Sequence, residues 1–320
     1  MSATRANLHA GPRTSEQWFR DLLACPDCGD PLRGLDLAAD ECRCGYRTSI
    51  RAVAGGEQLD LRPRKPTPRE VSLARTAPCS VDGELARLDT TKPKITYSGP
   101  QPIRDSRELL SAVMGGLSDG AKVLDLGCGP RDQAPCFDSL GCCYVGVDVH
   151  GEAADLLADA HALPFLSNAF DCVFSYAVLE HLWSPNVALR EVERVLKPGG
   201  VYVGTVSQGE PFHASFFHCT AWGLLSLLVA ADLQAERLWA GPDTLVALAR
   251  MGRYPRVIRA LLASTARLDG IPFLAPRRWA GRSEKDRELD AIHQAGSLCF
   301  VASKPSAFPA SRRASAAGSE

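Results

Sequence analysis

A glycine-rich turn flanked by carboxylates is the part of this chain best suited to hold a nucleoside-containing cofactor. Asp125 lies in the apolar run 123–126, Gly127 and Gly129 follow it, and Asp148 ends a second apolar run nineteen residues after Gly129. Glycine allows a tight turn and a close approach of the backbone to a ligand. A carboxylate at the end of the second strand can accept both ribose hydroxyls. Asp125 can accept a hydrogen bond from a ligand amine or an ordered water.

The same stretch departs from the pattern that binds dinucleotides. That pattern has a third glycine for helix packing and a pyrophosphate at the helix N-terminus. Here Gly127-Cys128-Gly129 is followed by Pro130-Arg131-Asp132. The residues therefore favour a different nucleoside cofactor and leave the geometry of the loop open.

Histidines that follow the predicted strands are candidates for a catalytic base. Histidine is the natural base for an oxygen or nitrogen nucleophile that must lose a proton near neutral pH. His181 stands next to Glu180, a few residues after the apolar run 170–176. The segment 210–218 contains a glutamate, three phenylalanines, His213 and His218. We expect Glu180, His181, His213 and His218 to be the candidate catalytic residues.

Each of these residues also has an ordinary structural explanation. Glu180 and His181 can serve only to shape a loop, and the histidines of 210–218 can cap backbone groups or pack. A metal site made by His213 and His218 is the weaker alternative to substrate contact, since residues five apart share a helical face poorly.

Four cysteines are spaced as metal ligands. Cys25 and Cys28 form a Cys-x-x-Cys pair, and Cys42 and Cys44 form a Cys-x-Cys pair after an interval of thirteen residues. Each pair is followed by a glycine, which allows the turn of a zinc knuckle. A redox Cys-x-x-Cys would not explain the second pair. We predict a structural Zn²⁺ site, whose metal would supply much of the folding energy of so small a segment.

The elements expected to position these residues alternate between strands and helices. Strands are predicted at 122–126, 142–148, 170–176, 201–206, 236–240 and 296–303. Helices are predicted at 106–117 and 133–140, from Ser184-Pro185 to Leu196, and from Thr220 to Ala231. Alternation of this kind requires a mostly parallel sheet with right-handed crossovers.

Composition divides the chain into segments. We expect disorder at 1–15, a cysteine-bearing domain at 16–62, a proline- and arginine-rich linker at 63–95, a main domain at 96–305 and a disordered tail at 306–320. A helical insertion at 242–295 could serve as a lid, a contact surface or scaffold.

The net charge of the chain does not indicate binding to nucleic acid or to a membrane surface. The chain has 320 residues, 36 Lys and Arg against 37 Asp and Glu, and a formal net charge of −1. Its N-terminus lacks the apolar core of a signal peptide, and no apolar run is long enough to insert into a membrane. We expect a cytoplasmic protein, in which twelve cysteines are not a disulfide framework.

The ordered set of motifs resembles the class I S-adenosylmethionine-dependent methyltransferases, especially their ubiquinone/menaquinone-methyltransferase-like branch. The resemblance lies in residues 123–130, 144–148, 158–165 and 170–200. It implies a doubly wound, seven-stranded, mostly parallel α/β sheet and S-adenosyl-L-methionine as the cofactor. It also implies that Gly127 and Gly129 cradle the methionine portion and that Asp148 holds the ribose.

The resemblance extends to other residues of the cofactor site. It implies that Asp159 accepts the adenine amino group beside the Ala160 backbone. Ser175 and Tyr176 would line the sulfonium and the substrate entrance, and Tyr97 would close over the cofactor.

The cysteine segment, in turn, is similar to the zinc-ribbon-like domain found in front of some RNA methyltransferases and in a small activator protein of several methyltransferases. The shared residues are 22–28 and 42–46. In such relatives the domain touches RNA or braces the catalytic domain.

Two functional interpretations follow. The first is transfer of a methyl group to a small molecule, such as a secondary metabolite, lipid or sugar intermediate. The second is an RNA methyltransferase that grips its substrate with the zinc module, which would need clustered Lys and Arg. A non-catalytic partner subunit is a distant third, which the intact Asp125, Asp148 and Asp159 argue against.

Overall fold

The computed structural model describes residues 18–54, 56–64, 82–91, 113–114, 116–209, 215–241, 244, 254–268 and 283–306, with only the backbone at 263–268. Several predictions from the sequence lie outside these residues. They are the disorder at 1–15, most of the linker 63–95, Tyr97, most of the helix 106–117, His213 and the tail after Ser306.

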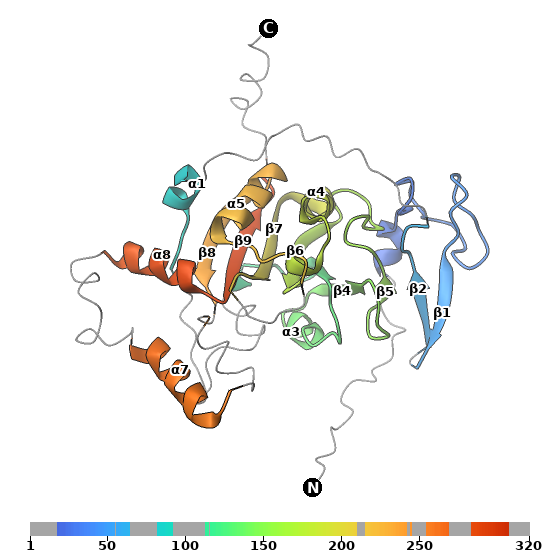
Figure 1. The fold of residues 1–320 in the computed structure, drawn as a ribbon. Coiled ribbons are helices and arrows are strands. Elements are labelled where there is room, and N and C mark those ends of the chain that lie inside the picture. The colour runs from blue at the N-terminus through green and yellow to red at the C-terminus, as the bar shows by residue number, and fades with distance from the viewer. Residues whose placement is uncertain are drawn as a thin grey trace.

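A single mixed sheet organises the described part of the chain (Figure 1). Its strand order is β1-β2-β5-β4-β3-β6-β7-β9-β8. The pairings from β2 through β5, β4, β3 and β6 to β7 are parallel, whereas β9 runs antiparallel to both β7 and β8. The strands are β3 (Lys122–Leu126), β4 (Cys143–Asp148), β5 (Leu156–Leu157), β6 (Phe170–Tyr176), β7 (Leu196–Ser207), β8 (Gln234–Ala240) and β9 (Ser297–Ser303).

These seven strands confirm the mostly parallel α/β fold, and an N-terminal hairpin enlarges the sheet to nine strands. The hairpin consists of β1 (Ser49–Val53) and β2 (Gly56–Asp60). β2 pairs in parallel with β5, through Leu59 opposite Leu156 and Asp60 opposite Leu157. The cysteine-bearing segment therefore joins the sheet of the main fold directly.

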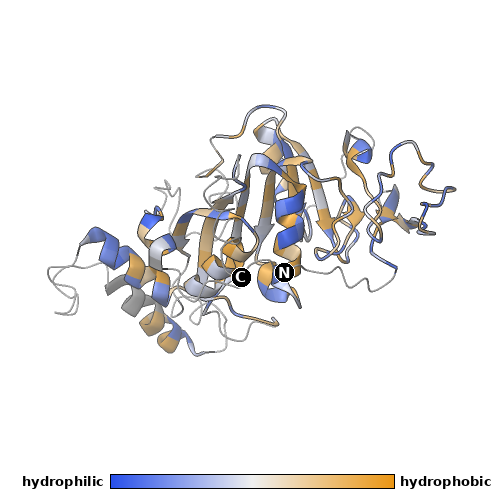
Figure 2. Ribbon diagram, turned by 90° about the horizontal axis from the view of Figure 1, so that it is seen from above, coloured by the Kyte–Doolittle hydropathy of each residue, from blue (hydrophilic) through white to orange (hydrophobic). Residues whose placement is uncertain are grey.

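Two apolar layers cover the sheet, because successive strand residues face opposite sides. Val173 belongs to the cluster packed beneath α4 (Pro185–Val195) and α5 (Ala221–Ala230). Its neighbours Cys172 and Phe174 belong to the cluster around α3 (Ala134–Ser139). Figure 2 shows apolar colours through the sheet and mixed colours on the helices around it.

Three helices begin where the sequence predicts. Pro135 lies in the first turn of α3, and Ser184 precedes α4, which has Pro185 at its first position. Thr220 caps α5 by accepting a hydrogen bond from the Gly223 amide at 3.1 Å.

Two helices of the predicted insertion are described. α7 (Arg256–Leu268) stands at the periphery in both views of the fold. α8 (Glu284–Gln294) begins with a Ser283–Asp286 capping box and contacts α1 (Asp82–Arg87) through a hydrogen bond from Lys285 Nζ to the Ala86 carbonyl. None of the described helices has the length and apolar character needed to span a bilayer.

Candidate functional site

The glycine turn lies at the carboxyl end of β3, as predicted. Gly127 and Gly129 both adopt positive φ, 70° and 51°. A Cβ on Gly127 would meet Val178 Cγ2 at 2.5 Å, so a side chain is excluded there by both conformation and space. The Gly129 amide donates to Asp148 Oδ2 at 3.0 Å. The carboxylate expected to hold the ribose therefore also fixes the turn.

Arg131, two residues after Gly129, adopts a backbone conformation that is usual for glycine. Its φ of 61° is left-handed, which is uncommon for a residue with a side chain. Its guanidinium pairs with Asp155 at 2.7 Å and lies over the Tyr144 ring at 5.2 Å. The sequence showed only that a glycine was absent; the structure shows that an arginine contact network supports the loop instead.

Asp125 lies buried beneath this loop. It is 1% exposed and accepts a hydrogen bond from the Tyr144 hydroxyl at 2.6 Å. Burial raises the pKa of Asp125 to about 7, and the carboxylates of Asp148 and Asp155 act in the same direction. The Tyr144 hydrogen bond and Arg131 oppose that rise. The predicted contact of Asp125 with a ligand amine would have to form on a carboxyl group already held by Tyr144.

Asp159 lies in a second cluster of polar residues, after β5. It accepts hydrogen bonds from the His161 amide at 2.9 Å and from His161 Nδ1 at 2.6 Å. Although burial acts to raise it, these hydrogen bonds hold the pKa of Asp159 below its usual value. His161 also accepts from the Ser184 amide and stacks on the Trp183 ring at 4.5 Å. Sequence reasoning missed His161, whose position two residues after Asp159 was the available signal.

The strand alternation of β6 separates two residues that were predicted to act together. Ser175 is fully buried, and its Oγ shares a hydrogen bond of 2.8 Å with the Tyr202 hydroxyl. Tyr176, at the end of the strand, is 42% exposed. Ala160 lies on the segment after β5 and is 7% exposed. The Ser175 side chain thus contributes to the core, whereas Tyr176 is accessible at the carboxyl edge of the sheet.

Glu180 joins the two segments that carry the histidine candidates. Its side chain is fully buried and accepts a hydrogen bond from the Ser207 amide at 3.1 Å. Its carbonyl accepts from the amides of Phe216 and Phe217. The Glu180 side chain and carbonyl thus connect the segment after β6 to the segment after β7. His181 and His218 are exposed on the segments that it connects.

The four cysteine sulfurs form a compact cluster. All four lie within 4.8 Å of one another, with Cys25–Cys44 and Cys28–Cys42 separations of 3.6 Å. A tetrahedral Zn²⁺ with Zn–S bonds of about 2.3 Å requires sulfurs about 3.8 Å apart. The donor set and its dimensions therefore fit zinc.

The turns and the electrostatics of the cluster fit the same ion. Gly29 and Gly45 both adopt positive φ directly after their cysteine pairs. Burial raises the pKa of Cys28 to about 11 and raises that of Cys25 further, whereas contacts with the Tyr46 amide and the other thiols lower that of Cys44. A bound cation would stabilise the thiolate form of all four groups.

Comparison with known proteins identifies the main domain. Residues 124–204 match the family model described as "Methyltransferase domain". This stretch holds the glycine turn, Asp148, Asp159 and the end of β6. Residues 124–204 therefore have the sequence of a methyltransferase domain.

Named relatives differ in the substrates that their names state. A tRNA (carboxymethyluridine(34)-5-O)-methyltransferase of Arabidopsis thaliana is 31% identical over 42% of this chain and 34% of its own length. A demethylmenaquinone methyltransferase of Streptomyces griseus is 32% identical over 37% of this chain and 55% of its own. The chain thus matches only part of each relative.

A solved structure shares part of the chain as well. Phosphoethanolamine N-methyltransferase 2 of Haemonchus contortus, in complex with S-adenosyl-L-methionine, aligns with 62% of this chain and 52% of its own. The identity is 19% and the TM-score 0.39.

Proposed function

We propose that this protein transfers a methyl group from S-adenosyl-L-methionine to a small-molecule acceptor. The observation that carries the proposal is the arrangement of Gly127, Gly129 and Asp148 at the carboxyl ends of adjacent parallel strands, inside the matched methyltransferase domain. Ligands bind at that edge in open α/β sheets.

When bound, the cofactor supplies an activated methyl group for in-line displacement, and the protein supplies alignment. In the proposed site Asp148 holds the ribose hydroxyls and the glycine turn accommodates the methionine portion. Asp159, oriented by His161, is available to the adenine amino group. Tyr176 borders the acceptor side of the site.

Exposed aromatic side chains favour a small organic acceptor. Phe216 is 68% exposed and Phe217 46% exposed, and their backbones are held by Glu180 next to His181. We propose His181 or His218 as the base for an acceptor that must lose a proton. Aromatic surface beside imidazoles suits an apolar or aromatic substrate with an ionisable group.

The charges of the cysteine module weigh against RNA as the acceptor. Residues 18–64 contain seven arginines and eight carboxylates. Several of these arginines are paired, including Arg43 with Asp30 at 2.9 Å and Arg47 with Glu41 at 2.7 Å. Phosphate binding needs unpaired cationic groups in a cluster. We therefore favour a small-molecule acceptor over RNA. For the module itself we propose a structural Zn²⁺, held by the four cysteines. Free thiolates suit a reducing compartment, so we propose that the protein works in the cytoplasm.

Calorimetric titration with S-adenosylmethionine and S-adenosylhomocysteine tests the proposal. We expect micromolar binding and a loss of affinity of about ten- to a hundredfold in Asp148→Ala, because a charged hydrogen-bond acceptor is removed. Asp138→Ala, an exposed carboxylate on α3, is the matched control and should bind normally. If the folded, metal-loaded protein binds neither compound, the enzyme assignment fails and the partner-subunit alternative takes its place.

A further inference from the structure

The N-terminal hairpin contacts the segments that carry the cofactor carboxylates, not merely the edge of the sheet. We propose that Gln58 and Arg62 are positioning residues of the cofactor site, which fix the loop after Asp148 in its binding conformation. This inference rests on the proposed cofactor binding. It assigns the cysteine module a direct part in that binding.

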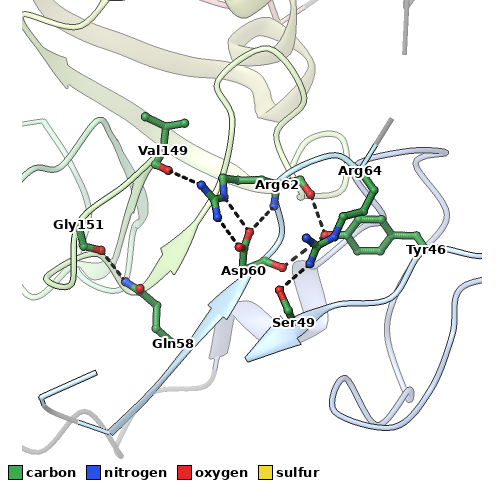
Figure 3. Close-up of polar contacts among 8 residues, drawn as sticks. All are labelled: Tyr46, Ser49, Gln58, Asp60, Arg62, Arg64, Val149 and Gly151. Atoms are coloured by element: carbon green, nitrogen blue, oxygen red, sulfur yellow. Dashed lines mark hydrogen bonds and ion pairs between the residues drawn. The ribbon is translucent and has the colours of Figure 1, made fainter. Parts of the chain in front are cut away.

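Gln58 spans the loop that joins β4 to β5. Its side chain is fully buried in β2, and Nε2 donates to the Gly151 carbonyl at 3.0 Å and to the Ala154 carbonyl at 2.7 Å (Figure 3 shows the Gly151 contact). Both carbonyl groups that accept from this amide thus lie on the loop that begins directly after Asp148. Its Oε1 atom has no hydrogen-bond partner among the described residues. A buried acceptor without a partner costs free energy, so the two hydrogen bonds to the loop are the polar contacts that favour this buried position.

Arg62 holds the beginning of the same loop. Its guanidinium binds both carboxylate oxygens of Asp60 and donates from Nη1 to the Val149 carbonyl at 3.2 Å (Figure 3). Asp60 is buried, and its hydrogen bonds with Arg62 lower its pKa, so the pair is charged at neutral pH. Because Val149 follows Asp148 directly, this contact constrains the backbone from which the predicted ribose ligand projects.

The far end of the loop connects to the glycine turn. Ala154 precedes Asp155, which accepts a hydrogen bond from the Gly146 amide and pairs with Arg131. The hydrogen bond from Gln58 to the Ala154 carbonyl therefore anchors the residue next to the ion pair that supports the turn. Both ends of the 149–155 loop depend on side chains of the module.

The module reaches the second cofactor segment through its backbone. The Ala24 amide donates to the Pro164 carbonyl at 3.0 Å, and the Leu166 amide donates to the Leu22 carbonyl at 2.7 Å. Pro164 and Leu166 follow Asp159 and His161 on the same segment. One module thus contacts the segments of both carboxylates.

Tyr46 links the cysteine cluster to these positioning residues. Its carbonyl accepts from the Cys42 amide at 2.9 Å, and its hydroxyl donates to the Arg62 carbonyl at 3.0 Å. Arg64 lies over its ring at 5.9 Å (Figure 3). The turn that would hold zinc and the strand that holds the cofactor loop are therefore one connected unit.

The test compares cofactor affinity in two variants that replace the polar side-chain group with an unbranched apolar side chain. In Gln58→Met and Arg62→Met we expect S-adenosylhomocysteine to bind roughly tenfold more weakly than in the wild type, by calorimetry. Zinc content and far-UV circular dichroism should stay unchanged. Hydrogen exchange at residues 149–157 should accelerate in both variants. Arg62→Lys, which retains a donor, should recover part of the affinity.

Arg51→Met is the matched control, because Arg51 lies exposed on β1 of the same hairpin and should leave affinity unchanged. Wild-type affinity together with wild-type exchange at 149–157 in both test variants would overturn the inference. If the wild type binds and Asp148→Ala does not, wild-type behaviour of the two test variants would contradict only the role of Gln58 and Arg62. The proposed cofactor binding would stand. If the folded wild type does not bind, the proposed function fails and the inference with it. Should Gln58→Met not fold, Arg62→Met still decides.

Discussion

Arg131 adopts a left-handed backbone conformation that is more usual for glycine. A left-handed conformation costs an ordinary L-residue about 1–2 kcal/mol, yet here the side chain contributes an ion pair with Asp155 and covers Tyr144. The loop is therefore held by side-chain contacts where a glycine would have relied on conformational freedom.

Two substitutions at this position separate the two effects. Arg131→Ala and Arg131→Gly both remove the guanidinium, but only glycine relieves the backbone. We expect the glycine variant to be more stable than the alanine variant by about 1 kcal/mol in urea unfolding. Equal stability of the two would mean that residue 131 leaves the left-handed region once the arginine is gone.

Asp125 makes the stability of the cofactor-free protein depend on pH. Its folded pKa, about 7, lies above the ordinary value of 3.8. Between these values the folded state binds more protons than the unfolded state, so this group's contribution to stability falls as the pH rises. We expect the melting temperature of Asp125→Asn, relative to that of the wild type, to increase from pH 4 to pH 7. A constant difference across that range would contradict the burial argument.

At the scale of elements, the sequence allowed the inner strands and helix starts to be predicted because their signals are local. The run 122–126 is β3 residue for residue, and Pro135, Ser184 and Thr220 mark helix starts. β7 begins at Leu196 and not at 201, because Leu196 pairs with Phe170 before a register irregularity. Such pairing depends on another strand and leaves no mark in the local pattern.

The hairpin and the positioning residues escaped prediction for the same reason. β1 and β2 carry no strong apolar alternation, and β2 pairs with a strand of only two residues. Gln58 and Arg62 resemble ordinary polar residues until the 149–155 loop is placed beside them. The carboxylates proposed for the cofactor site, by contrast, were candidates from the sequence because Asp125, Asp148 and Asp159 lie in a recognisable order of motifs.

At the scale of the whole molecule, the metal site should influence the stability of the complete sheet. Cys28→Ser should lose zinc, and its melting temperature should fall by about 5 °C or more, since a structural zinc contributes directly to folding. Cys136→Ser, a cysteine outside the cluster, should retain one zinc per chain and the wild-type melting temperature. Metal analysis and thermal unfolding on the same samples check both; loss of zinc without a fall in melting temperature would contradict a structural role.

The parallel pairing of β2 with β5 also has a consequence for the order in which the chain folds during synthesis. The cysteine module emerges from the ribosome before β5, and the four sulfurs that would hold zinc all come from residues 25–44. Once zinc is bound, β2 would present a preformed strand edge, and β5 would pair with it as the rest of the sheet folds. Zinc supply during translation, and not only in the finished protein, would then determine how much of the chain reaches its native state.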